Sequence, residues 1–131
     1  RRRVDGMIVA NTTVSRPPGL RDAKAREAGG LSGRPLFRLA TRMLAETFVR
    51  AESAFPLIGA GGIDSGAAAV AKLRAGCCLV QLYSALVFRG LGLLAEIKAE
   101  MLRALEASRG ESLADLVGID AAALTGEPWP K

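Results

Sequence analysis

Short apolar runs alternate with longer segments of helical periodicity along this chain. The runs lie at residues 7–10, 56–61 and 77–84, the last with Leu79, Val80, Leu82 and Tyr83 as its apolar members, and glycine, proline or polar residues lie at their borders. Short continuous runs of this kind are typical of strands buried on both faces. We therefore expect three strands, separated by segments whose apolar positions follow a different period.

Between and after these runs, apolar residues recur every three or four positions, as they do on one face of a helix. This pattern predicts helices over residues 35–55, 66–75 and 90–110, the last with a stripe formed by Leu94, Ile97, Met101 and Leu105. Pro35 suits a first helical turn, Asp64 or Ser65 can cap the second helix, and Gly76 and Gly110 suit helix ends.

The remaining segments contain fewer regular patterns. Residues 14–35 are rich in proline, glycine and charge and predict a long connecting loop, which in a compact domain is usually functional. Ser112 can cap a short helix over residues 112–120, and residues 122–131 predict an irregular tail. The order strand, loop, helix, strand, helix, strand, helix predicts an α/β fold with a parallel sheet and crossover helices.

Three strands are few for such a sheet, since a (β/α)8 barrel takes about 250 residues. We therefore expect the last strands of a larger fold, in which the missing part covers sheet edges and apolar surface. Within the chain we expect one main unit over residues 1–110 and a C-terminal helix and tail over residues 111–131.

Composition narrows the chemistry. The chain has 131 residues, a formal net charge of +5 and no histidine, which excludes Ser-His, Cys-His and His-metal schemes within it. Its basic residues are scattered apart from the cluster at residues 1–3, and we interpret them as solvated surface rather than a nucleic-acid site. Cys77 and Cys78 are adjacent, lack zinc-site or redox-motif spacing, and are expected to serve as small apolar residues at a strand start.

Polar or glycine-rich segments follow each expected strand. They are Asn11-Thr12-Thr13, the Gly59–Gly62 segment and Tyr83-Ser84, and the loop contributes Gly29-Gly30-Leu31-Ser32-Gly33. Ligands of parallel α/β folds gather where the strands end, so these segments should face one side of the sheet. The glycines suit either a phosphate site beside a helix N-terminus or a tight turn with close packing, and their spacing alone does not decide.

Other side chains have weaker claims to a site. Asn11 and the threonines can bind a ligand or make ordinary turns, and Tyr83 can lie at a phosphate or close a core. Arg16, Arg34 and Arg38 are expected at the surface, and Asp64 is better interpreted as a helix cap than as a ribityl or ribose partner. No carboxylate pair, activated nucleophile or metal cluster is evident in the sequence, so we assign no catalytic or metal-binding residue.

Four motifs taken together resemble one family. The segments DGMIVANTTVSRP, GGLSGRPL, PLIGAGGIDSG and AGCCLVQLYSALVFRGLGLLAEIKAEM are similar to the C-terminal portion of dihydroorotate dehydrogenase, and favour its quinone-dependent, membrane-associated class. The resemblance weakens after Gly110. It implies part of a (β/α)8 barrel that holds FMN and an enzyme that oxidises dihydroorotate to orotate in pyrimidine biosynthesis, with a quinone as electron acceptor.

The resemblance also implies roles for particular residues. Asn11 and Thr12 match substrate-binding positions, and the FMN contacts, mostly around its phosphate, match Ala10, Gly33, Gly62, Tyr83 and Ser84. Ala10 stands where the family often has threonine, which leaves only backbone for that contact. Cys77-Cys78 stand where Ala-Ser is usual.

The family's membrane-binding helices, first barrel strands, catalytic serine and flavin-contacting lysine have no counterpart in these residues. We therefore expect a fragment that is inactive alone, whose quinone site and membrane contact belong to the missing part, and an enzyme peripheral to the cytoplasmic side of a bacterial inner membrane. The alternatives are another phosphate- or flavin-binding barrel enzyme and, less favoured, a basic nucleic-acid-binding module.

Overall fold

Three parallel strands form the centre of the computed structural model, which describes residues 4–130. They are β1 (Met7–Val9), β2 (Leu57–Ala60) and β3 (Leu79–Gln81), in the spatial order β1-β2-β3. The register aligns Ile8 with Ile58 and Ile58 with Leu79. The parallel sheet predicted from the sequence is confirmed, although each strand is shorter than its apolar run.

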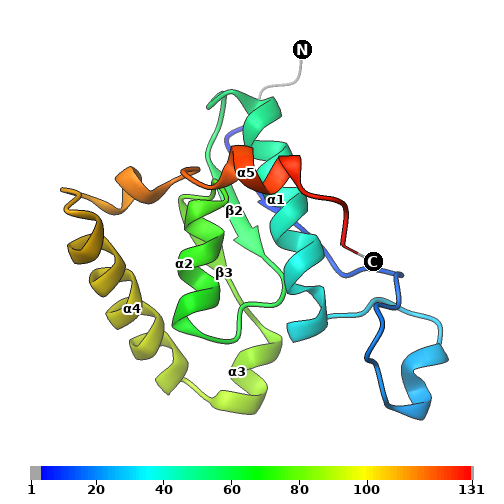
Figure 1. Cartoon of the computed structure of the whole chain (residues 1–131). Coiled ribbons are helices and arrows are strands. Elements are labelled where there is room, and N and C mark those ends of the chain that lie inside the picture. The colour runs from blue at the N-terminus through cyan, green and yellow to red at the C-terminus, as the bar shows by residue number, and fades with distance from the viewer. Residues whose placement is uncertain (1–3, 131) are drawn as a thin grey trace.

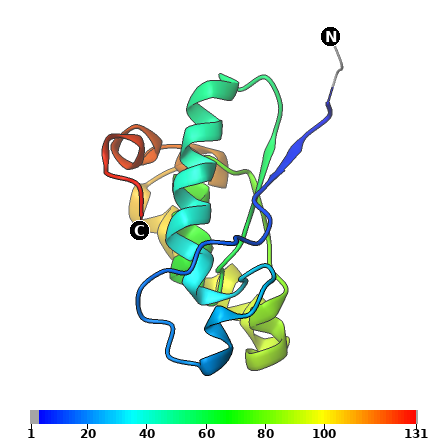
Figure 2. The ribbon, with the colours of Figure 1, turned by 90° about the vertical axis from the view of Figure 1, so that its right-hand side faces the viewer.

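The longer helices lie on one face of this sheet (Figures 1 and 2). They include α1 (Phe37–Ala51) and α2 (Gly66–Arg74), and α4 (Gly92–Ser108) packs against α2. Because side chains alternate along a strand, Val9 points toward the helices and is buried, whereas Ile8 and Leu79 are 55% and 60% exposed. Within the described residues one face of the sheet is therefore open, so the strands are not buried on both faces. This exposed apolar face agrees with the expectation that another part of a larger fold covers it.

Local signals explain where the helices begin and end. A 3-10 turn over Arg34–Leu36, with Pro35 inside it, leads into α1. The Ser65 hydroxyl accepts a hydrogen bond from the Ala68 N–H at 3.2 Å and so caps α2, which leaves Asp64 free of the capping role predicted as one option. Gly76 follows α2 with φ +123°, where a Cβ would lie 2.2 Å from Phe48, so glycine is required at this turn.

Two helices depart from the sequence-based prediction. Residues Ser84–Arg89 form α3, which directly follows the third expected strand, and Ala121–Gly126 form α5 within the segment predicted as an irregular tail. In α4 the deeply buried positions are Leu93 and Ile97, whereas Leu94, which was predicted in the stripe, is 39% exposed. The short helix expected over residues 112–120 is limited to a 3-10 helix, η3 (Leu113–Leu116), which Ser112 caps as predicted in a capping box with Asp115.

Arg42 of α1 ties the end of the chain to the rest of the molecule. Its guanidinium is bonded to Glu46, donates to the carbonyl oxygen of Thr125 at 2.8 Å and to that of Glu127, and lies 4.7 Å from the centre of the Trp129 ring. Only 7% of Arg42 is exposed. The segment that follows η3 is therefore anchored on α1 by a buried charge rather than by apolar packing alone.

The core lies between the sheet and the helices. One cluster includes Leu44, Leu57 and Leu73, and a second is formed where α2 meets α4 around Ala69 and Ile97. Cys77 belongs to the first cluster, as predicted for a small apolar residue, but Cys78 is exposed and both precede β3. No helix in residues 4–130 combines the length and apolarity that a membrane crossing requires. The basic cluster at residues 1–3 lies outside the described residues.

Candidate functional site

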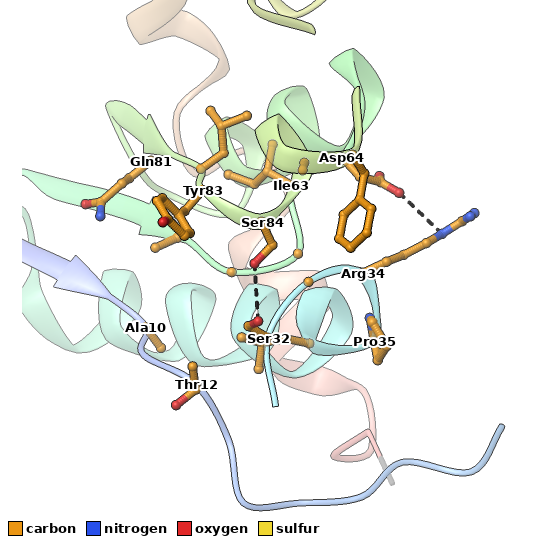
Figure 3. Close-up of a pocket in the computed structure, with 18 of the residues that line it drawn as sticks. Ala10, Thr12, Ser32, Arg34, Pro35, Ile63, Asp64, Gln81, Tyr83 and Ser84 are labelled. Carbon is orange, nitrogen blue, oxygen red and sulfur yellow. Dashed lines mark hydrogen bonds and ion pairs between the residues drawn. The ribbon is translucent and has the colours of Figure 1, made fainter. Parts of the chain in front are cut away.

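A pocket of about 610 Å³ opens where the three strands end (Figure 3). Parallel strands place their carboxyl ends at one edge of a sheet, so segments far apart in sequence meet there. All seven site residues predicted from the sequence line this pocket: Ala10, Asn11, Thr12, Gly33, Gly62, Tyr83 and Ser84. Their proximity was expected from the strand order, whereas the contribution of the long loop depends on how that loop folds.

The turn after β2 exposes backbone to the pocket. Gly61 and Gly62 have φ of +91° and +76°, a region that residues with a Cβ rarely adopt. A Cβ on Gly62 would also lie 2.4 Å from Phe37 Cα, so close packing against the start of α1 independently requires glycine. Among the described residues, no acceptor is assigned to the N–H of Gly62. The turn thus allows close packing against α1 and also leaves the Gly62 N–H as a donor at the pocket.

The long loop folds back over the same edge. Thr13 and Leu31 form an isolated antiparallel bridge, and the Arg16 guanidinium donates to loop carbonyls, including those of Glu27 at 2.7 Å and Gly29 at 2.9 Å. Arg16 is therefore more than the surface residue expected from the sequence, because it holds the loop closed. Gly30 passes so close to Thr12 that a Cβ there would lie 2.0 Å from the Thr12 hydroxyl oxygen.

Ser84 connects the loop with the end of β3. Its hydroxyl is 3.2 Å from that of Ser32, although the two residues are 52 positions apart in sequence (Figure 3). Neighbouring Gly33 has φ +74° and begins the turn that leads into α1. Tyr83 is 81% exposed, which contradicts the alternative of an aromatic ring that closes a core. Within residues 4–130 the Ser84 N–H, like that of Gly62, has no assigned acceptor.

Asn11 and Thr12 lie across the pocket from these donors. The Asn11 Oδ1 accepts a hydrogen bond from the Thr12 N–H at 2.8 Å. This local hydrogen bond fixes the amide group and leaves its NH2 end for a ligand. Both residues are exposed at the pocket wall, and Ala10 beside them offers no side-chain hydrogen bond.

Charged residues surround the other end of the pocket. Arg34 pairs with the Asp64 carboxylate at 3.4 Å, and Arg89 donates to the Asp64 carbonyl at 2.8 Å and to Glu96 at 2.7 Å. Asp64 is thus bound by two arginines instead of capping a helix. Arg38 lines a separate cavity. No group of three or more potential metal ligands occurs in the part of the chain that the structure describes.

Lys72 is a buried residue near the site that the sequence-based reasoning missed. Its ammonium is 0% exposed, donates to the Ala60 carbonyl at 3.2 Å and lies 5.3 Å from the centre of the Phe37 ring. Burial lowers its pKa to about 8, and burial also raises the pKa of the nearby Cys77 thiol to about 11. Lys72 lies one helical turn after Ala68 and Ala69, so helical periodicity places it on the apolar face of α2. That position could have identified it as a buried lysine.

A parallel α/β unit with a glycine turn and hydroxyls at its strand ends is consistent with part of a (β/α)8 barrel, a class of fold in which ligands bind at this edge. Comparison of the sequence with known proteins narrows the class of barrel protein to one family. The family profile for dihydroorotate dehydrogenase matches residues 1–105. The chain is 67% identical over 130 residues to a dihydroorotate dehydrogenase (quinone) of Rhodopseudomonas palustris and 62% identical to one of Bradyrhizobium diazoefficiens.

Solved structures agree with this assignment. The chain superposes on the ligand-free enzyme of Eimeria tenella with a TM-score of 0.83 and 35% identity, which covers 88% of this chain and 32% of the other. A complex of that enzyme with ferulenol superposes equally well. The chain belongs to the dihydroorotate dehydrogenase family. It spans 36% of the length of the bacterial relatives, although 98% of the chain is matched.

Proposed function

We propose that this chain forms the phosphate and substrate end of an FMN-dependent dihydroorotate dehydrogenase that passes electrons to a quinone. The observation that supports it most directly is the convergence of Gly62, Ser84 and Asn11 on one pocket in a chain of this family. FMN, when bound, supplies the acceptor for hydride from the substrate. The residues of this chain bind and orient, and none of them is assigned to proton removal.

The anionic end of FMN fits the Gly62 and Ser84 side of the pocket. Two backbone N–H groups without assigned acceptors and the hydroxyl of Ser84 are the donors that a phosphate accepts. Arg89 also lines this end but is paired with Glu96, and the Asp64 carboxylate is paired with Arg34, so the donors on this side are chiefly the backbone N–H groups and the Ser84 hydroxyl. Gly33 and Tyr83 complete this side, where Gly33 allows the loop backbone to approach closely.

The substrate fits the Asn11 and Thr12 side. The free NH2 end of the Asn11 amide can donate to a carbonyl or carboxylate oxygen of dihydroorotate, and the Thr12 hydroxyl adds a second polar contact. Ala10 contributes backbone beside the flavin. A quinone acceptor places the complete enzyme at a membrane surface, on the cytoplasmic side of the bacterial inner membrane, where it serves pyrimidine biosynthesis.

Purification of the complete gene product that carries these residues tests the proposal. We expect bound flavin that is released as FMN on denaturation, and dihydroorotate-dependent reduction of a soluble quinone analogue. We expect the 131-residue chain alone to show no turnover. A gene product that retains FMN but ignores dihydroorotate would favour another flavin-dependent barrel enzyme, and one that binds no flavin would refute the proposal.

A further inference from the structure

Lys72 is a fully buried cation that has no carboxylate partner among residues 4–130. Transfer of an unpaired ammonium from water into a protein interior is costly, and buried lysines are therefore normally paired with an acid. None of the ion pairs within residues 4–130 includes Lys72. Its described polar contact is one hydrogen bond to the Ala60 carbonyl, supplemented by the face of the Phe37 ring. The free-energy cost of burying this ammonium therefore suggests that the charge has a role at its position.

Of the described acidic side chains on the elements around α2, none forms an ion pair with Lys72. The elements packed against α2 are α1, α4, β3 and η3, and β2 lies beneath it through the Lys72 bond. Their acidic side chains are Glu46 on α1, Glu96, Glu100 and Glu106 on α4, and Asp115 in η3, and their basic ones are Arg38, Arg42, Arg50, Lys98 and Arg103. β2 and β3 carry no charged residue, and the neighbouring titratable group is the Cys77 thiol.

The position of Lys72 relative to the pocket suggests that role. Ala60, which accepts its hydrogen bond, lines the pocket and is followed directly by the Gly61–Gly62 turn. Phe37, whose ring faces the ammonium, is also the residue against which Gly62 packs. The ammonium therefore lies behind the Gly61–Gly62 turn, on the side away from solvent. There it contacts Ala60, which precedes the turn, and Phe37, against which the turn packs.

We propose that Lys72 is a positioning residue, whose buried ammonium holds the Ala60–Gly62 backbone and supplies from behind it the positive charge that favours an anion at this end of the pocket. The inference rests on the proposed function, because it makes the FMN phosphate that anion. It explains why the positive charge is buried without a carboxylate: an internal acid would cancel the field that the phosphate senses. The phosphate itself then provides the missing counter-charge.

The test compares FMN with riboflavin, which has the same ring system but no phosphate. The complete gene product is stripped of flavin, and the ratio of the two dissociation constants is measured between pH 7 and 9.5. Above pH 7 the phosphate is already doubly ionised, since its second pKa is about 6. The burial-lowered pKa of Lys72, about 8, lies inside this range, so we expect the preference for FMN to fall about tenfold as pH rises through it.

Three variants separate charge from structure. Lys72→Gln removes the charge but keeps a donor for Ala60, Lys72→Met removes both, and Lys98→Met removes an exposed lysine on α4 as the matched control. We expect both Lys72 variants to prefer FMN about tenfold less at pH 7 and to lose the pH dependence. The control should match the wild type. If Lys72→Met fails to fold, Lys72→Gln and the wild-type pH profile still decide.

The outcomes distinguish the two proposals. Flavin binding with an unchanged FMN preference in Lys72→Gln overturns the inference alone, because Lys72 would then be a structural donor only. Inorganic phosphate, followed through the Gly62 amide resonance, provides the second probe. Lys72-dependent phosphate binding without flavin binding keeps the inference and overturns the proposed function. The absence of both kinds of binding overturns both.

Discussion

Alanine substitutions of three glycines can separate the energetic cost of steric overlap behind the pocket from the cost of a left-handed backbone conformation. Gly92, the first residue of α4, lacks a left-handed φ and has open space around its Cβ position. Gly90 has φ +69° but also open space, whereas Gly62 combines φ +76° with a Cβ position 2.4 Å from Phe37 Cα. Alanine at Gly92 therefore adds neither backbone strain nor steric overlap. At Gly90 it adds backbone strain alone, and at Gly62 it adds both.

The expected changes in the free energy of unfolding differ accordingly. Gly92→Ala should be neutral or should stabilise the chain by up to about 1 kcal/mol, because alanine is the better helix former. Gly90→Ala should destabilise it by about 1–2 kcal/mol, the cost of a left-handed residue with a Cβ. Gly62→Ala adds an overlap that must be relieved by movement of α1, for a total of about 3–4 kcal/mol.

Urea unfolding of the 131-residue chain, followed by far-UV circular dichroism, measures these differences. Phe37→Ala in the Gly62→Ala background should not restore stability, because two of the three nearest atoms, Cα and N of Phe37, belong to the backbone. Equal destabilisation by Gly62→Ala and Gly90→Ala would refute the reasoning, since α1 would then yield without measurable cost.

Further predictions concern the tail, the buried ionisable pair and the substrate side. Arg42→Met should destabilise the fold by about 2–4 kcal/mol and shift the emission of Trp129, the sole tryptophan, because the Thr125 carbonyl and the Glu46 carboxylate lose a buried charged donor. Between pH 8 and 9, stability should rise by up to about 1.4 kcal/mol per pH unit, since unfolded Lys72 binds a proton that the folded lysine has lost; Lys72→Met should abolish this rise in urea titrations. Above pH 9 the raised pKa of Cys77 should offset it, because the unfolded thiol ionises first, and Cys77→Ala should extend the rise toward pH 10.5. Asn11→Ala should raise KM for dihydroorotate about tenfold while FMN content stays unchanged, and equal loss of FMN would place Asn11 in the flavin site instead.

The periodic parts of the fold were predictable because local sequence determined them. The apolar runs located all three strands, and the helical stripes located α1, α2 and α4, with Ser65 as one of the two caps considered. The tail was not predictable in this way. Its helix α5 depends on contacts with α1, and the adjoining Glu127 carbonyl accepts a hydrogen bond from Arg42, 85 positions away. A local sequence pattern does not predict contacts between residues so far apart.

The same distinction applies to the site. Parallel strands bring their ends together, so the strand order alone predicted Asn11, Gly62 and Ser84 as neighbours. The helix α3 was missed because its six residues are too few to show a helical repeat, and none of them is buried. Lys72 was missed for a different reason, because a lysine among apolar helix residues is normally assumed to reach solvent.

The glycine turn after β2 shows why a motif and its function must be argued separately. Gly62 is required by its φ of +76° and by contact with Phe37, so its presence would be explained even if nothing bound beside it. The case for a phosphate rests on what the packing does not explain: donors of Gly62 and Ser84 without assigned acceptors in the described chain, and a buried ammonium behind the turn without a carboxylate. Packing accounts for the glycine, whereas an anion accounts for the charge and the unpaired donors. A substitution that removes the charge and leaves the turn intact, Lys72→Gln, is therefore more informative about the ligand than any substitution of the glycine itself.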